Sequence, residues 1–175
     1  MAITTKKGDN GSTHLYYGGR VLKDHVKVEA CGDLDELCSF LGLSRSLLKD
    51  KAIKKIISSM QEDLFIICAE LATSSKFINK LKTRIDKTYV LRLEQIIAGL
   101  EGKRILKKRT FYIPGDNLLS SSLDIARTVA RRCERHVVTL KKKGLLSNKW
   151  IIIYLNRLSD LLYLLARGYG RRRNA

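Results

Sequence analysis

Proline is nearly absent from this 175-residue chain, which has only Pro114, so few positions force a helix to end. Aromatic residues make up 7%, and 17 acidic residues face 34 Lys and Arg, which gives a formal net charge of +17. With 45% hydrophobic residues, the chain is too apolar for a disordered basic tail. The composition predicts one folded domain that attracts a phosphate-rich partner: a nucleotide, a nucleic acid or an anionic membrane surface.

Other absences exclude further classes of protein. The opening residues, MAITTKKGDNGS, lack the apolar stretch of a secretory signal, so we expect a cytoplasmic protein. The apolar window 150–166 is interrupted by Asn156 and Asp160, which argues against a membrane span. Neither the cysteines nor the histidines show metal-ligand spacing, and we expect reduced thiols. These residues are Cys31, Cys38, Cys68, Cys133, His14, His25 and His136.

Apolar residues recur at spacings of three and four through most of the chain, which predicts an all-α protein. Lengths and short links favour an antiparallel five-helix bundle over 33–171, preceded by an irregular N-terminal arm over 1–30, in a single domain over 1–175. In the first helix, Asp33, Asp35 and Glu36 would lie in the first turn, where carboxylates favour the helix dipole. The predicted helices are 33–49, 52–73, 85–101, 117–142 and 148–171.

The N-terminal arm contains the run from Gly8 to Thr13 directly after Lys6 and Lys7. Glycines can turn backbone N–H groups toward an anion, and lysines add charge, so the run could cradle a phosphate. It does not have the residue order of a Walker A loop. The dipeptide Asn10-Gly11 is also a strong signal for a type I′ hairpin turn between short strands over 4–6 and 13–17, and the pattern alone favours this hairpin. The residues alone leave both interpretations open.

Two polar stripes mark the last two predicted helices. One side of helix 117–142 carries three arginines interleaved with acids, and guanidinium groups suit phosphate, so this is either a solvated face or an anion site. Helix 148–171 has a stripe amid apolar residues, which predicts partial burial of Asn156 and Asp160. Either a network from Asp160 to an arginine of the preceding helix or ligand contact would satisfy them. The stripes comprise Asp124, Arg127, Arg131, Glu134 and Arg135, and Asn156, Asp160, Tyr163 and Arg167.

Four sequence blocks occur in a characteristic order: TKKGDNGST with GGRVLKD, ACGDLDELCSFLG, FYIPG followed by ARTVARRCER, and YLNRLSDLLYLLAR. Because of these blocks, the chain resembles the PduO-type ATP:cob(I)alamin adenosyltransferases over almost its whole length. The resemblance implies a five-helix bundle that assembles as a homotrimer with ATP at the subunit interfaces. It implies transfer of the 5′-deoxyadenosyl group of ATP to the cobalt of cob(I)alamin or a related corrinoid, giving adenosylcobalamin and triphosphate.

Site residues follow from the resemblance position by position. It implies catalytic roles for Arg131, Glu134, Asp35 and Arg127, with the last two paired across a subunit interface, and places Phe111 where an aromatic residue helps displace the lower axial ligand of the corrinoid. Mg²⁺ is implied as the metal of ATP, bound through the phosphates with Glu134 nearby. The implied ATP-binding residues are Thr5, Lys6, Lys7, Gly8, Thr13, Lys23, Arg131, Arg132, Glu134, Arg135 and Asn156.

The chain departs from the family pattern at Asp116, where a second glycine is usual, and at His14. Further implied partners are a reductase and an adenosylcobalamin-dependent enzyme; a membrane or nucleic acid is not implied. The net charge keeps one alternative of another class, a basic helical nucleic-acid-binding protein without catalysis. A noncatalytic ATP-binding scaffold is a third. Catalysis leaves most of the excess charge without a role.

Overall fold

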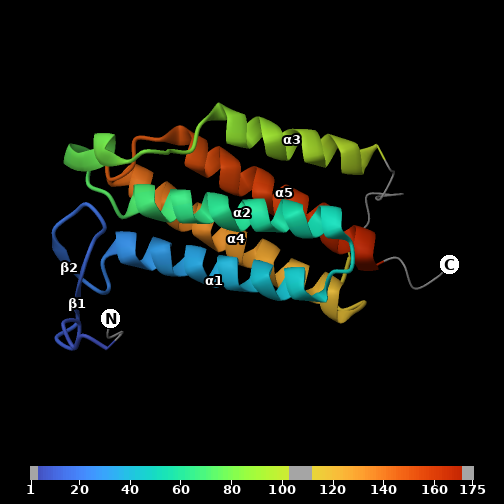
Figure 1. Cartoon of the computed structure of the whole chain (residues 1–175), viewed down its shortest axis with the longest axis horizontal. Coiled ribbons are helices and arrows are strands. Elements are labelled where there is room, and N and C mark those ends of the chain that lie inside the picture. The colour runs from blue at the N-terminus through green and yellow to red at the C-terminus, as the bar shows by residue number, and fades with distance from the viewer. Residues whose placement is uncertain (1–3, 103–111, 171–175) are drawn as a thin grey trace.

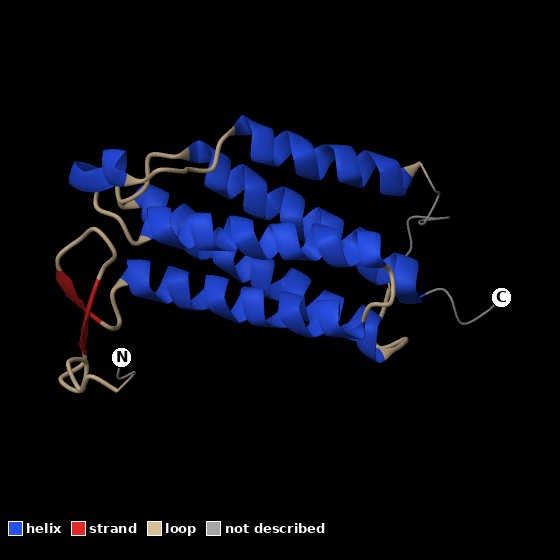
Figure 2. Ribbon diagram, in the orientation of Figure 1, coloured by secondary structure: helices blue, strands red, loops and turns tan. Residues whose placement is uncertain are grey.

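The computed structural model describes residues 4–102 and 112–170 (Figures 1 and 2). The prediction of a mostly helical chain is confirmed for this part, with a small two-stranded sheet added at the N-terminal end. Among the described residues, no helix is long and apolar enough to cross a membrane. The elements are β1 (Ser12–His14), β2 (Arg20–Leu22), α1 (Val26–Leu47), α2 (Lys51–Leu71), the 3-10 helix η1 (Ser75–Lys80), α3 (Lys87–Glu101), α4 (Leu118–Lys142) and α5 (Lys149–Gly170).

Side-chain caps fix where most helices begin. Asp50 accepts hydrogen bonds from the N–H groups of Ala52 and Ile53 at 2.8 and 3.2 Å, and Asp86 caps α3 through Thr88. At α4, the side chain of Asn117 accepts the backbone N–H of Ser120, and the side chain of Ser120 accepts the backbone N–H of Asn117. This reciprocal capping box satisfies both N–H groups. These local signals explain why α2 to α5 lie within two residues of their predicted starts.

The predicted start of the first helix is wrong. α1 begins at Val26, seven residues before the expected position, because the imidazole of His25 accepts the N–H of Lys27 at 3.1 Å and caps the helix there. The arm therefore ends near residue 25. Asp33, Asp35 and Glu36 lie in the second and third turns rather than the first, so the helix dipole does not account for them.

The predicted hairpin is also wrong in its pairing. β1 pairs with β2 in antiparallel register, Thr13 opposite Val21, and Asn10-Gly11 lies before the first strand rather than between the two. The side chain of Asn10 accepts hydrogen bonds from Ser12 and from Arg20, which replaces the expected strand pairing with a side-chain-stabilised turn.

α4 packs against α1 and α5, and α1 also packs against α2. These neighbours run antiparallel, as predicted (Figure 1). The pairing of α3 with α5 differs: Asn148 near the start of α5 donates to the Ile85 carbonyl before α3 at 2.8 Å, and Arg157 pairs with Glu94 further along. α3 and α5 therefore run in the same direction. The core includes Leu34, Leu37, Leu41, Ile57, Met60, Ile67, Leu123, Leu155, Leu158 and Leu162.

Polar pairs within the bundle also differ from expectation. Asp160 is exposed, and its ion pair at 3.9 Å is with Arg157 of its own helix, so the predicted link from Asp160 to an arginine of the preceding helix is wrong. α4 and α5 are joined instead by a buried ion pair in which the helices exchange roles: the arginine, Arg167, is on α5 and donates to the aspartate, Asp124, on α4. The helical period places residues on a stripe but does not fix which partner each one faces.

Candidate functional site

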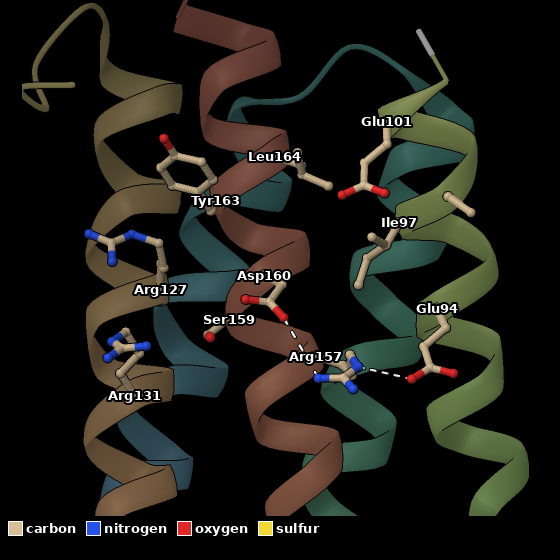
Figure 3. A pocket seen from close by; sticks show the side chains of 11 residues that line it. Glu94, Ile97, Glu101, Arg127, Arg131, Arg157, Ser159, Asp160, Tyr163 and Leu164 are labelled. Carbon is tan, nitrogen blue, oxygen red and sulfur yellow. Dashed lines mark hydrogen bonds and ion pairs between the residues drawn. The ribbon is translucent and has the colours of Figure 1, made fainter. Parts of the chain in front are cut away.

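A surface pocket of about 460 Å³ lies where α5 passes between α3 and α4 (Figure 3). α5 provides the floor, and the two neighbouring helices provide the walls. The lining combines three arginines and three carboxylates with a shorter apolar section. Lining residues are Glu94, Ile97, Ala98, Glu101, Arg127, Arg131, Arg157, Ser159, Asp160, Tyr163 and Leu164.

The two α4 arginines of the pocket differ in their partners. Arg127 donates from Nε to Asp124 Oδ1 at 3.3 Å and is only partly exposed. Arg131 is exposed, and within the part of the chain that the structure describes its guanidinium makes no hydrogen bond or ion pair. Because all five of its N–H donors are free, Arg131 is the cation of this pocket best able to take up an anion.

Glu134 and Asn156, predicted from separate helices, are brought together. Asn156 Nδ2 donates to Glu134 Oε1 at 3.1 Å, and Asn156 Oδ1 accepts from Arg157 at 2.8 Å. Glu134 lies one turn beyond Arg131 on α4, so this polar pair extends the pocket toward the N-terminal end of α1. Arg135 is exposed and donates to the Arg131 carbonyl at 3.2 Å.

Arg132 faces a different side of α4. Its Nε donates to Asp33 at 2.9 Å and its other nitrogen contacts Glu36, both on α1; the hydrogen bond to Asp33 raises the pKa of Arg132 above its usual value. His136, one turn later, also contacts Asp33. In one chain these contacts hold Arg132 against α1 rather than beside the pocket.

The arm residues gather at the end of the molecule where α1 begins (Figure 1). A β carbon at Gly8 would lie 3.3 Å from Lys23 Nζ, so the glycine leaves room for that amine. Lys6 and Lys7 are exposed, and the Lys7 carbonyl accepts from Arg20 at 3.4 Å. Thr5 is exposed and Thr13 is half-buried in β1. Among the described residues, no hydrogen bond or ion pair joins Lys6, Lys7 or Lys23 to the pocket.

Asp35 lies away from the pocket on the outer face of α1. It borders a small hollow of about 40 Å³ between α1 and α2, beside Cys38, Phe65 and Cys68. Phe65 is 67% exposed, which is unusual for a large apolar ring. Asp35 and Arg127 therefore line different pockets of the same chain.

Phe111 lies outside the described residues, but the following residue, Tyr112, contacts Arg167 with its ring. The sequence did not predict that α3 contributes residues to the site. Glu94, Ile97, Ala98 and Glu101 are spaced three and four apart, so they lie on one helical face; that spacing was the available signal. Their polar and apolar mixture alone does not distinguish a pocket wall from a solvated face.

Comparisons with known proteins agree along the whole length of the fold. Residues 3–169 match the family model described as cobalamin adenosyltransferase. A corrinoid adenosyltransferase of Citrobacter freundii is 40% identical over 166 residues, covering 94% of this chain and 93% of that protein. One of Bacillus subtilis is 36% identical over 180 residues, with 95% and 86% covered.

Solved structures give the same result. A variant PduO-type ATP:corrinoid adenosyltransferase from Lactobacillus reuteri, complexed with cobalamin and ATP, superposes with a TM-score of 0.87 at 30% identity, covering 98% of this chain and 96% of that one. Another variant of it, complexed with ATP, gives 0.85 at 30% identity, with 97% and 96% covered. The chain belongs to the cobalamin adenosyltransferase family.

Proposed function

We propose that this protein transfers the 5′-deoxyadenosyl group of ATP to the cobalt of a reduced corrinoid, giving an adenosylcorrinoid and triphosphate. The observation that carries the proposal is the Arg131 guanidinium, which has no partner among the described residues, in a pocket next to the Glu134–Asn156 pair. Full-length similarity to corrinoid adenosyltransferases, one of them solved with cobalamin and ATP, supports it. The same similarity favours transfer over nucleic-acid binding.

The reaction needs no nucleophile from the protein, because the cobalt itself is the nucleophile. Co(I) attacks the C5′ carbon of ATP, the cobalt–carbon bond forms, the C5′–O bond breaks, and its electron pair leaves on triphosphate. The protein must align the two reactants and stabilise the leaving anion. We assign Arg131 and Arg135 of α4 to receive that charge; the hydrogen bond from Asn156 to the Glu134 carboxylate limits the orientation of that carboxylate.

Mg²⁺ fits this arrangement as a metal carried by the nucleotide. The described residues include no group of three or more His, Cys, Asp or Glu side chains able to hold a metal ion, and Mg²⁺ typically uses one or two carboxylates with substrate phosphates. Glu134, half-buried and held by Asn156, would be the carboxylate beside a metal-bound phosphate. When bound, the ion would neutralise phosphate charge.

A homotrimer with sites between subunits would unite residues that one chain keeps apart. In one chain, the arm that carries Lys6, Lys7 and Lys23 has no described link to the pocket. Asp35 and Arg127 likewise line separate pockets. We therefore assign the arm of one subunit to the ATP site of the next, with Arg132 close to that interface and Asp35 paired to the Arg127 of a neighbouring subunit. The five long helices would form the bundle of each subunit.

On the corrinoid side, we assign Phe111 to displacement of the lower axial ligand. Loss of that ligand raises the Co(II)/Co(I) potential and eases reduction to the reactive state. The electron and the product then call for a reductase and an adenosylcobalamin-dependent enzyme as partners, in a cytoplasmic setting.

The Arg131→Ala variant tests the proposal in an anaerobic assay with ATP, Mg²⁺ and chemically reduced cobalamin, followed by absorbance of the cobalt–carbon bond. We expect wild-type turnover and a loss of about 100-fold or more in the variant, because a charge aimed at the leaving group is removed. Arg45→Ala, another exposed helical arginine outside the pocket, is the matched control. An inactive wild type would refute the reaction, and an active Arg131→Ala would remove this arginine from the site.

A further inference from the structure

Arg167 is the most deeply buried cation near the pocket, with 3% of its side chain exposed. Arginine is rarely buried without a partner. Here one terminal nitrogen donates to Asp124, and the guanidinium carbon lies 5.4 and 5.5 Å from the ring centroids of Tyr112 and Tyr163. The plane of the guanidinium is thus held by one carboxylate and two aromatic rings, and its Nε has no hydrogen-bond partner among the described residues.

The first connection from Arg167 to the pocket passes through Asp124. This carboxylate is itself buried; one oxygen accepts from Arg167 and the other accepts from Arg127 Nε at 3.3 Å. Arg127 lines the pocket. A single carboxylate therefore connects the core arginine to a pocket arginine and limits the orientations that Arg127 can adopt.

The second connection is direct. Tyr163 precedes Arg167 by one helical turn. Its ring lines the pocket (Figure 3), and the guanidinium carbon of Arg167 lies 5.5 Å from the centroid of that ring. Figure 3 shows Leu164 and Ile97 toward the Tyr163 end of the pocket, with the Glu101 carboxylate at its edge, and Arg131 toward the other end, with Glu134 one turn beyond it on α4. The ring that Arg167 holds thus belongs to the part of the pocket suited to a flat, largely apolar surface rather than to a triphosphate.

Stability alone is not enough to account for this arrangement. Burying an arginine and a carboxylate costs desolvation free energy, and an apolar pair of similar volume often stabilises a fold as well or better. A second buried carboxylate provides a structural reference. Asp63 contacts Arg92 of α3, which lies 5.4 Å from the Tyr89 ring centroid; Arg92 is 41% exposed where Arg167 is 3% exposed, and none of these three residues lines the pocket.

We propose that Arg167 is a positioning residue that fixes the Tyr163 ring, and through Asp124 the Arg127 guanidinium, for the corrin ring of the substrate. The inference rests on the proposed function and deepens it, since it assigns the apolar section of the pocket to one of the two substrates. Tyr112 also joins this assembly, next to the Phe111 position assigned to the corrinoid.

Arg167→Lys tests the inference, because lysine keeps a charge for Asp124 but loses the planar group held between two rings. We expect KM for cob(I)alamin to rise about 10-fold or more and kcat to fall, with KM for ATP within about twofold of wild type. Arg92→Lys, the same substitution at the other arginine that contacts an aspartate and an aromatic ring, is the control; it should lower the thermal midpoint without changing either KM. Tyr163→Leu, which leaves Arg167 and Asp124 in place, should raise KM for cob(I)alamin in the same way.

The double variant Arg167→Lys with Tyr163→Leu should raise KM for cob(I)alamin by less than the product of the two single effects, because both changes act on one ring. Wild-type values for Arg167→Lys, an equal change in Arg92→Lys, or multiplicative effects in the double variant would each overturn the inference while the reaction itself stands. If Arg167→Lys does not fold, an unchanged KM for cob(I)alamin in Tyr163→Leu overturns it. An inactive wild type would instead refute the proposed function.

Discussion

The thiol of Cys133 is fully buried in α4, on the side opposite the pocket arginines, and burial raises its pKa from 9.0 to about 12. A thiol that stays protonated in the fold but ionises in the unfolded chain stabilises the fold fully below pH 9. That contribution is lost as pH rises from 9.0 toward 12. The alkaline limit of stability is therefore set in part by a single buried side chain that does not line the pocket.

Replacing this residue should remove that pH dependence. The free energy of unfolding of wild type should fall by about 1.4 kcal/mol per pH unit more steeply than that of Cys133→Ala between pH 9.5 and 11. Urea unfolding at several pH values measures both slopes, and the variant's cavity lowers its stability by a constant amount at all of them. Parallel slopes would show that Cys133 ionises equally easily in the folded and unfolded chains.

Where elements meet, Glu70 joins three helices. It is 3% exposed near the end of α2 and accepts hydrogen bonds from Arg84 at 3.1 Å, from the Ile85 N–H at 3.3 Å and from Asn148 at 2.8 Å. Ile85 leads into α3 and Asn148 into α5, so one carboxylate fixes the ends of these two helices to α2. The parallel course of α3 beside α5, which sets one wall of the pocket against its floor, begins at this point.

Glu70→Gln should loosen this junction without unfolding the chain. We expect a loss of about 1 to 3 kcal/mol, because the amide keeps one acceptor oxygen while a buried charge-assisted contact is lost. Glu62→Gln, at an exposed position on the same helix, should leave the free energy of unfolding unchanged. Urea midpoints of the two variants give the comparison; equal midpoints would mean that Asn148 and Arg84 find other partners at no cost.

At this scale the sequence predicts what local chemistry determines. Asp50, Asp86 and Asn117 are strong N-terminal caps, so the starts of α2, α3 and α4 follow from their neighbours in the chain. His25 is a weaker signal, and the start of α1 was missed. The Asp124–Arg167 pair could not be predicted, because it depends on how α4 and α5 are rotated against each other, which packing decides.

For the whole molecule, the proposed assembly has a specific consequence. If each site takes its arm from one subunit and its α4 from the next, an arm variant and an α4 variant should complement one another. Lys6→Ala with Lys7→Ala, and separately Arg131→Ala, should each be nearly inactive. Mixed and reassembled at equal amounts, they should recover about a quarter of wild-type activity, the share of sites that receive two intact halves.

Light scattering checks the assembly itself, with an expected mass of about three times the 19.9 kDa chain. Trimers that form but recover no activity on mixing would place both halves of the site in the same subunit. A monomer would contradict the composite site. The activity of each variant alone is the baseline against which the activity of the mixture is compared.

Among the described residues, Lys6 alone combines a side chain with a left-handed backbone, at φ 57°. Glycine or asparagine would occupy this conformation at lower conformational energy, by about 1 to 2 kcal/mol for glycine. The turn therefore retains a lysine where backbone preference alone favours another residue. The proposed contact of Lys6 with the phosphates of ATP would account for this lysine, and a substitution that relaxes the turn, such as Lys6→Gly, is then expected to stabilise the arm and weaken ATP binding.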